Sequence, residues 1–235
     1  MIQQQIIALG GGGFSMEPEN PLLDRYIIAQ TTSERPKVCF LPTASSESDV
    51  YVVNFYAAFT ALGCKPSHLY LFRPHTADIA DFLLSHDVIY VGGGNTKSML
   101  AVWRAWGLDY ILRQALEHGV VLAGISAGAI CWFEAGLTDS IPGKLSPLPC
   151  LSYLPGSATP HYDGEAARRP AYQQQIAEGM LPPGIALDDG AAAHYVNGQL
   201  SGVVSSRPAA RAYQVIRGTD GGAHETALPT QYLGR

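Results

Sequence analysis

The sequence is short of cysteine, of charge and of long apolar runs. Its four cysteines lie far apart and form no C-x-x-C pair, which argues against a disulfide framework or a paired-cysteine metal site and predicts reduced core residues. They are Cys39, Cys64, Cys131 and Cys150. No apolar run reaches the roughly 18 residues of a membrane span, and the N-terminal segment lacks the basic region of a signal peptide. We therefore expect no membrane association and a cytoplasmic location.

Charge is scarce and is not gathered on one segment. Charged residues make up 15% of the chain, its 15 Lys and Arg residues form no run, and the formal net charge is −5. Nucleic acid and anionic membranes are therefore not expected as partners. The histidines lack a metal-ligand spacing such as H-E-x-x-H, so no metal is expected. A small-molecule or peptide ligand remains.

A run of glycines at 10–13 follows the first apolar segment and invites a nucleotide-binding interpretation. Pro18 follows too closely for that, because it interrupts the helix whose N-terminus would face a pyrophosphate. The run is better explained as a tight turn, and no nucleotide or other cofactor is expected.

Short β-rich runs alternate with amphipathic helical segments before the midpoint, which predicts an α/β fold with a doubly wound, mainly parallel sheet and helices on both faces. A length of 235 residues fits a single domain spanning residues 1–235. The second half is less regular, with Pro, Gly and Ser at 137–159 and short antiparallel strands expected from 191 onward. The predicted strands of the first half are 6–9, 37–41, 69–72, 88–91 and 120–124, and the predicted helices are 21–31, 50–62, 79–84, 97–106 and 108–118.

The segment from 120 to 130 carries the strongest chemical signal. A β-branched run leads into Gly124-Ile125-Ser126-Ala127-Gly128, a G-x-S-x-G, and a helix-forming sequence follows. In a nucleophile elbow of this form, the serine lies at a sharp strand-to-helix turn with its hydroxyl exposed, and the amide of the next residue, Ala127, faces an oxyanion. The alternative is a strand followed by a turn that only requires small residues.

A serine nucleophile needs a base and an acid that orients it. His161 is the first candidate for the base, because it lies in a polar loop introduced by a proline, and His194 is the alternative. Asp139 follows the serine closely in the sequence and is a candidate for the acid. Asp188 and Asp189 close a later strand and remain alternatives, and a solvated surface carboxylate is the bland interpretation of all three.

A second glycine-rich turn follows the predicted strand 88–91. The carboxyl ends of parallel strands lie at one edge of the sheet, so we expect this turn near Ser126. The amides of Gly93 and Gly94 could supply the second donor to an oxyanion. Helix capping by Asn95 alone would also explain the sequence.

Three motifs taken in order resemble the peptidase E (aspartyl dipeptidase) family of serine peptidases. They are G-G-G-N-T at 92–96, G-I-S-A-G-A at 124–129 and P-H at 160–161. The resemblance covers roughly residues 5 to 200. It implies a flavodoxin-like sheet similar to that of class I glutamine amidotransferase domains, with a serine in place of the amidotransferase cysteine at the elbow after a central strand.

The resemblance also implies roles for individual residues. Ser126 would be the nucleophile and His161 the general base, and Asp139 fits the place of the family's acid with a short deletion. Oxyanion donors would come from Ala127, Gly93 and Gly94. Family members of known activity cleave dipeptides with an N-terminal Asp, so we expect a short peptide substrate, with a homodimer as one candidate assembly.

The sequence departs from the best-known branch of that family after His161, where Arg168-Arg169 occurs. An arginine here can hold a substrate carboxylate bidentately, which would suit an acidic side chain. The alternative is a solvated arginine pair at the start of a helix. Substrate choice therefore stays open.

Three other interpretations were weighed against the serine peptidase. An α/β-hydrolase esterase shares the elbow, but its acid and base lie much farther along the chain than the 35 residues that separate Ser126 from His161. A cyanophycinase-like hydrolase belongs to a related branch with a different substrate. A non-catalytic amidotransferase-like binding domain would have kept the fold and lost the chemistry.

Overall fold

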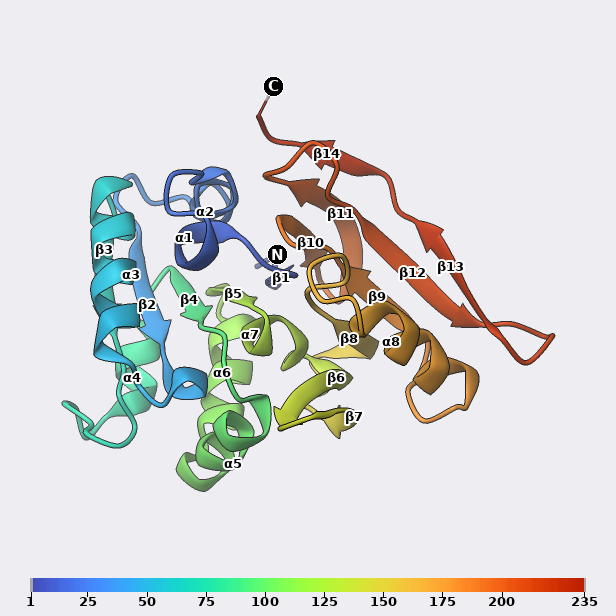
Figure 1. Ribbon diagram of the computed structural model, residues 1–235. Helices are drawn as coiled ribbons and strands as arrows, with labels where there is room; N and C mark the ends of the chain where they lie inside the picture. The colour runs from blue at the N-terminus through green and yellow to red at the C-terminus, as the bar shows by residue number, and fades with distance from the viewer. Residues whose placement is uncertain (1, 235) are drawn as a thin grey trace.

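The first strand, β1 (Gln5–Leu9), lies in the middle of the larger sheet of the computed structural model, which describes residues 2–234. It pairs in parallel with β5 (Val121–Ile125) and antiparallel with β10 (Ala191–Val196). The strand order is β14-β11-β10-β1-β5-β4-β2-β3 (Figure 1). The five parallel strands, in the order β1-β5-β4-β2-β3, confirm the predicted flavodoxin-like α/β fold with the elbow after a central strand.

The larger sheet is completed by strands from both halves of the chain. These are β2 (Lys37–Leu41), β3 (Lys65–His68), β4 (Val88–Val91), β11 (Gln199–Ser205) and β14 (Thr230–Tyr232). Helices and one 3-10 helix follow the parallel strands, and the last of them, α7, leads from β5 into the second sheet. They are α1 (Gly13–Met16), α2 (Leu22–Ile28), η1 (Thr43–Ser45), α3 (Asp49–Ala61), α4 (Ile79–Leu84), α5 (Thr96–Trp106), α6 (Leu108–Glu117) and α7 (Ala127–Ile130).

Two apolar cores cover the two faces of this sheet. Successive residues of a strand point to opposite faces, so Ile6 of β1 joins the core under α4, α5 and α6, and Ile7 joins the core under α1, α2 and α3. Both side chains are almost fully buried. The sheet is therefore covered on both faces, as the alternating strand and helix segments predict.

A second sheet of six strands, in the order β13-β12-β9-β8-β6-β7, lies beside the first (Figure 1). Its strands are β6 (Phe133–Ile141), β7 (Lys144–Pro149), β8 (Leu154–Thr159), β9 (Gly184–Leu187), β12 (Ala212–Arg217) and β13 (Ala223–Ala227). Helix α8 (Arg168–Ala177) packs on it through Tyr172 and Ile176. The antiparallel strands expected from residue 191 onward include β12 and β13 of this sheet. The sequence does not predict β6, β7 and β8, because the Pro, Gly and Ser content of this region hides the strand pattern.

One predicted strand is displaced along the chain. Residues 69–72 were expected to form it, but β3 occupies Lys65–His68 and pairs in parallel with β2. The amides of Leu71 and Phe72 donate to the carboxylate of Glu47, not to a neighbouring strand. Because β3 is an edge strand and only partly buried, its sequence lacks the apolar run by which the other strands were recognised.

The cysteine prediction is confirmed, since all four thiols are free and buried. Burial raises the pKa of Cys39 to about 12, as expected for an inert core thiol. Within residues 2–234, no helix combines the length and the apolar character that a membrane crossing requires.

A buried carboxyl group lies beneath α1. Asp24 of α2 is 1% exposed, and its Oδ1 has no hydrogen-bond partner among the described residues. Desolvation raises the pKa of Asp24 to about 7, although a hydrogen bond from the Phe14 amide opposes the shift. Ionised Asp24 is therefore destabilising, because a charge in this position is poorly compensated.

We predict that this group makes stability depend on pH. The pKa of Asp24 in the folded chain, about 7, exceeds its ordinary value of 3.8, so the folded state holds the proton more tightly. The stabilisation that comes from this bound proton is fully present at pH values below the ordinary pKa of 3.8, and it is lost as the pH rises through the folded-state pKa of about 7. An asparagine at this position does not ionise. The melting temperature of Asp24→Asn should therefore rise relative to that of the native chain as the pH increases from about 5 to about 8.

The control is Asp81→Asn, which changes an exposed aspartate of α4. Thermal melts followed by circular dichroism measure both differences. A difference between Asp24→Asn and the native chain that stays constant over this pH range would contradict the prediction.

Candidate active site

Ser126 lies at the sharp turn between β5 and α7. Its backbone angles, φ 57° and ψ −111°, are outside the regions that L residues normally adopt, and such strain is typical of a nucleophile elbow. The turn is so tight that a Cβ atom added to Gly128 would lie 2.3 Å from the carbonyl oxygen of Val91 in β4. Glycine at this position lets α7 approach the sheet closely enough to present the serine at its edge.

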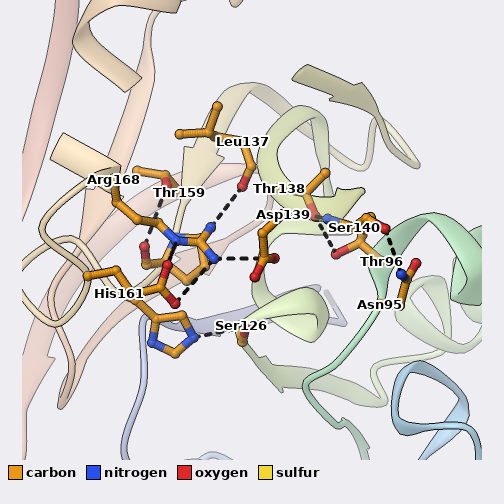
Figure 2. A network of polar contacts seen from close by, with 12 residues as sticks. Asn95, Thr96, Ser126, Leu137, Thr138, Asp139, Ser140, Thr159, His161 and Arg168 are labelled. Carbon is orange, nitrogen blue, oxygen red and sulfur yellow. Dashed lines mark hydrogen bonds and ion pairs between the residues drawn. The ribbon is translucent and has the colours of Figure 1, made fainter. Parts of the chain in front are cut away.

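His161 approaches the serine from the second sheet. It follows β8, and its amide donates to the carbonyl of Gly10 in the first glycine-rich turn. Its imidazole Nε2 lies 3.0 Å from Ser126 Oγ (Figure 2). The histidine that the sequence indicated is therefore within hydrogen-bond reach of the serine.

The other imidazole nitrogen contacts Asp189. His161 Nδ1 lies 2.6 Å from Asp189 Oδ1, and the two side chains are only 13% and 12% exposed. An ionised carboxylate can only accept, so Nδ1 carries the proton and Nε2 is left to accept from the serine hydroxyl. The amide of Asp189 donates to Asp163 Oδ1 at 2.7 Å, which fixes the backbone that carries the carboxylate.

The pairing of two strands explains why His161 and Asp189 meet. Strands β8 and β9 are parallel neighbours, with Thr159 opposite Ala186, and each residue of the pair lies just beyond the carboxyl end of its strand. Gly11 provides the space, because a Cβ atom added there would lie 1.9 Å from Asp189 Oδ1. The strand end at Asp188 and Asp189 was visible in the sequence, but its neighbour β8 was not.

The structure departs from the assignment of Asp139 as the orienting acid. Its carboxylate is 62% exposed and pairs with the guanidinium of Arg168 at 3.4 Å (Figure 2). Asp189, not Asp139, occupies the Nδ1 side of the imidazole. The physical reason lies in Arg168, which is 2% exposed and needs counter-charges where it is buried.

Arg168 likewise departs from its assignment as a substrate-binding residue. Its Nε lies 2.6 Å from Glu165 Oε2, and its Nη1 donates to the carbonyl of Leu137 at 3.2 Å. With Asp139, these partners engage both Nη atoms and Nε of the buried guanidinium (Figure 2). The side chain holds the loop after His161 against β6, and no free edge is left for a bidentate contact with a substrate carboxylate.

Asp188 and His194, the alternative acid and base, do not belong to the hydrogen-bonded chain of Ser126, His161 and Asp189. Asp188 Oδ2 accepts from the amide of Arg211 at 2.9 Å, and burial raises the pKa of Asp188 to about 6. His194 in β10 is buried, and its two ring nitrogens contact Tyr26 Oη and Gln5 Oε1. Neither residue replaces His161 or Asp189.

The glycine-rich turn after β4 lies beside the serine, as the sequence predicts. A Cβ atom added to Gly93 would lie 3.3 Å from the Cβ atom of Ser126. The amide of Gly93 donates to Tyr51 Oη at 3.3 Å, so an incoming oxyanion would replace that hydroxyl. Ala127 is buried at the first position of α7, and Gly94 packs against Ala44. The oxyanion roles of these residues stay predictions.

A cavity of about 450 Å³ opens at Ser126 and His161. Its other walls come from α1, from η1 and the first turns of α3, and from Gly93 and Ile125 at the strand ends. Within residues 2–234 no three His, Cys, Asp or Glu side chains gather as metal ligands. A hydroxyl, an imidazole and a carboxylate in this order at the floor of a cavity can support nucleophilic attack on a carbonyl group.

Comparisons with known proteins agree with this chemistry. The model of peptidase family S51 matches residues 6–203. The chain is 57% identical over 234 residues to a protein of Bacillus subtilis (strain 168) named "Uncharacterized peptidase YgaJ", and the alignment covers 98% of this chain and 100% of that protein.

Two solved structures share the fold. A protein from Listeria monocytogenes EGD-e named "Putative Peptidase E Protein" has a TM-score of 0.63 at 19% identity, over 87% of this chain and 98% of the other. A peptidase from an acI-B1 Actinobacterium has a TM-score of 0.68 at 14% identity, over 95% of this chain and 94% of the other. At these identities the likeness is one of fold alone.

We predict that the elbow tolerates no side chain at Gly128. Gly128→Ala should lower the free energy of unfolding by about 1 to 3 kcal/mol, because the added Cβ meets the backbone of a buried strand. The matched control is Gly202→Ala in β11, where nothing lies within 4 Å of an added Cβ and the change should stay below about 0.5 kcal/mol. Urea denaturation measures both, and equal losses would contradict the prediction.

Proposed function

Because the chain belongs to peptidase family S51, a family of serine-type peptidases, we propose that it cleaves short peptides through an acyl-enzyme formed on Ser126. His161 is the general base and Asp189 holds the imidazole in the productive tautomer. The observation that carries this proposal is the unbroken hydrogen-bonded chain from Ser126 Oγ through the imidazole to Asp189 Oδ1.

The proposed reaction has two halves. In the first, Nε2 of His161 takes the hydroxyl proton as Ser126 attacks the scissile carbonyl, and the imidazolium then protonates the leaving amine. In the second, the imidazole takes a proton from water as the water attacks the ester, and the imidazolium then returns that proton to Ser126 Oγ as the acid leaves. Asp189 stays ionised throughout and stabilises the imidazolium that forms in each half.

The developing oxyanion requires donors on the side of Ser126 away from His161. The amides of Ala127 and Gly93 are the candidates, and the second is supported by the closeness of Gly93 to the serine, since a Cβ atom added there would lie 3.8 Å from Ser126 Oγ. Removing one such donor typically costs a large factor in rate. In the free protein the Gly93 amide donates to the Tyr51 hydroxyl, and on this proposal the oxyanion replaces that hydroxyl as the acceptor.

The size of the substrate follows from the cavity. A volume of about 450 Å³ falls in the range of small-ligand sites and accommodates a few residues, not a folded protein. The expected N-terminal aspartyl preference would need a cation that faces this space. Arg168, the residue proposed for that role from the sequence, is buried against other partners, so the proposal is for short peptides without that restriction.

The first test is covalent. A fluorophosphonate probe should label the native chain at Ser126, because the activated hydroxyl attacks phosphorus as it attacks a carbonyl. Labelling should vanish in Ser126→Ala and persist in the control Ser98→Ala, which removes an exposed hydroxyl of α5. Folded native protein that takes up no probe would reject the proposed nucleophile and favour a non-catalytic binding domain.

A second test compares Asp189 with Asp139 as the acid that orients His161. Asp189→Asn should slow labelling and peptide hydrolysis about 100-fold or more, since the amide favours the wrong imidazole tautomer. Asp139→Asn weakens only an ion pair at an exposed carboxylate, so its rates should fall less than about threefold. Initial rates are measured on folded protein, verified by circular dichroism. The reverse order of effects would restore Asp139 as the acid.

A further inference from the structure

The cavity beside Ser126 has walls of a particular chemistry. Helix α1 contributes Ser15 and Met16, and the segment from η1 into α3 contributes Ser45, Tyr51 and Asn54. Helices α1 and α3 contact each other on one face of the larger sheet (Figure 1). One side of the cavity is thus made by the sheet that carries the serine, and the second sheet contributes only His161.

Charge is absent from these walls. Among the described residues that line the cavity there is no Arg, Lys, Asp or Glu. The arginines of the neighbouring loops are engaged elsewhere: Arg169 lies over the Tyr162 ring and pairs with Glu225, and Arg207 pairs with Glu17. Within residues 2–234, no Arg or Lys lines the cavity to neutralise an acidic substrate side chain.

The nearest catalytic carboxylate also disfavours an acidic ligand. Asp189 lies behind His161, whereas the carboxylate of Glu17, directly after α1, is already paired with Arg207. With a formal net charge of −5, the protein adds no compensating positive field. An ionised aspartyl side chain that entered the cavity would lose part of its hydration and gain no ionic partner, which is costly.

Uncharged groups have suitable partners in the same place. The carboxamide of Asn54 is on the exposed part of α3, and the hydroxyl of Ser15 contacts the hydroxyl of Tyr51 and lies 3.5 Å from the carbonyl oxygen of Gly12. Met16 and Val50 are 44% and 71% exposed at the rim. These groups can donate or accept one hydrogen bond and cover apolar atoms, which suits a neutral side chain of moderate size.

We propose that this cavity binds an uncharged residue on the acyl side of the scissile bond and rejects the aspartyl side chain, with Asn54 as a specificity-determining residue. The proposal rests on the peptidase function proposed above. It differs from the aspartyl preference implied by the resemblance to peptidase E. Because Asn and Asp have the same shape, the pair isolates the effect of charge from the effect of size.

The experiment compares short peptides that differ only in Asn or Asp on the acyl side of the same bond. Both are tested as free dipeptides and as the same sequences extended by one alanine at each end, with products identified by mass spectrometry. The native chain should cleave the Asn peptides with a kcat/KM about tenfold or more above that of the Asp peptides. Equal values, a preference for Asp, or no cleavage of either by protein that fluorophosphonate labels would overturn the proposal.

A charge introduced into the wall provides the second arm. Asn54→Arg should raise the ratio of kcat/KM for Asp over Asn peptides about tenfold, because it supplies the missing cation. The control Thr60→Arg adds the same charge to an exposed position of α3 outside the cavity and should leave the ratio unchanged. Equal ratios in the two variants would remove Asn54 from the specificity site.

The two proposals fail in different ways. Loss of fluorophosphonate labelling in the folded native chain would reject the serine peptidase itself. Normal labelling at Ser126, together with a preference for Asp peptides, would reject only the neutral cavity. Circular dichroism verifies that both arginine variants are folded, and labelling of the control Thr60→Arg at the native rate shows that an arginine added to α3 leaves the nucleophile intact, so a ratio changed only in Asn54→Arg reports on substrate binding.

Discussion

The proposed site depends on the contact between His161 Nδ1 and Asp189 Oδ1, and this contact is produced by the arrangement of the two sheets. It exists because β8 and β9 are parallel neighbours, so that the residues beyond their carboxyl ends lie together. The chain then leaves β9 in the second sheet and enters β10 in the first, which brings the pair to the edge where β5 ends. The glycine at position 11 leaves room for the carboxylate between the sheets. Tertiary pairing, not local sequence, therefore builds the proposed base and its partner.

The parts of the site that the sequence predicted are those determined by local constraints. A glycine at position 128 is required by the carbonyl of Val91, and the strain at Ser126 follows from the same turn, so the elbow is visible in five residues. Asp189 could not be chosen over Asp139, because that choice depends on β8. The sequence of β8, Leu154–Thr159, contains Pro155 and Gly156 and lacks the apolar alternation by which strands are recognised.

The placement of Asp139 and Arg168 away from the roles expected of them has one common cause. A guanidinium that is 2% exposed has lost most of its hydration and must recover that free energy from partners. Glu165, Asp139 and the carbonyl of Leu137 supply them. Each residue alone resembles a functional group in the sequence, but together they neutralise one another and fix the loop after His161. A charged residue close to a nucleophile in sequence is therefore weak evidence for catalysis until its partners are known.

In the proposed mechanism the two sheets contribute different residues. The second sheet carries His161 and Asp189, whereas the cavity walls beside Ser126 come mostly from α1, η1 and α3 on the first sheet. The walls share only Ser126 and His161 with the hydrogen-bonded chain. On the proposal made above, a substitution of Asn54 would change which side chain is bound and leave the contacts of the imidazole in place. The same fold and the same serine can therefore accept different substrates in different chains, and substrate class has to be argued from the cavity of each chain, not from its family.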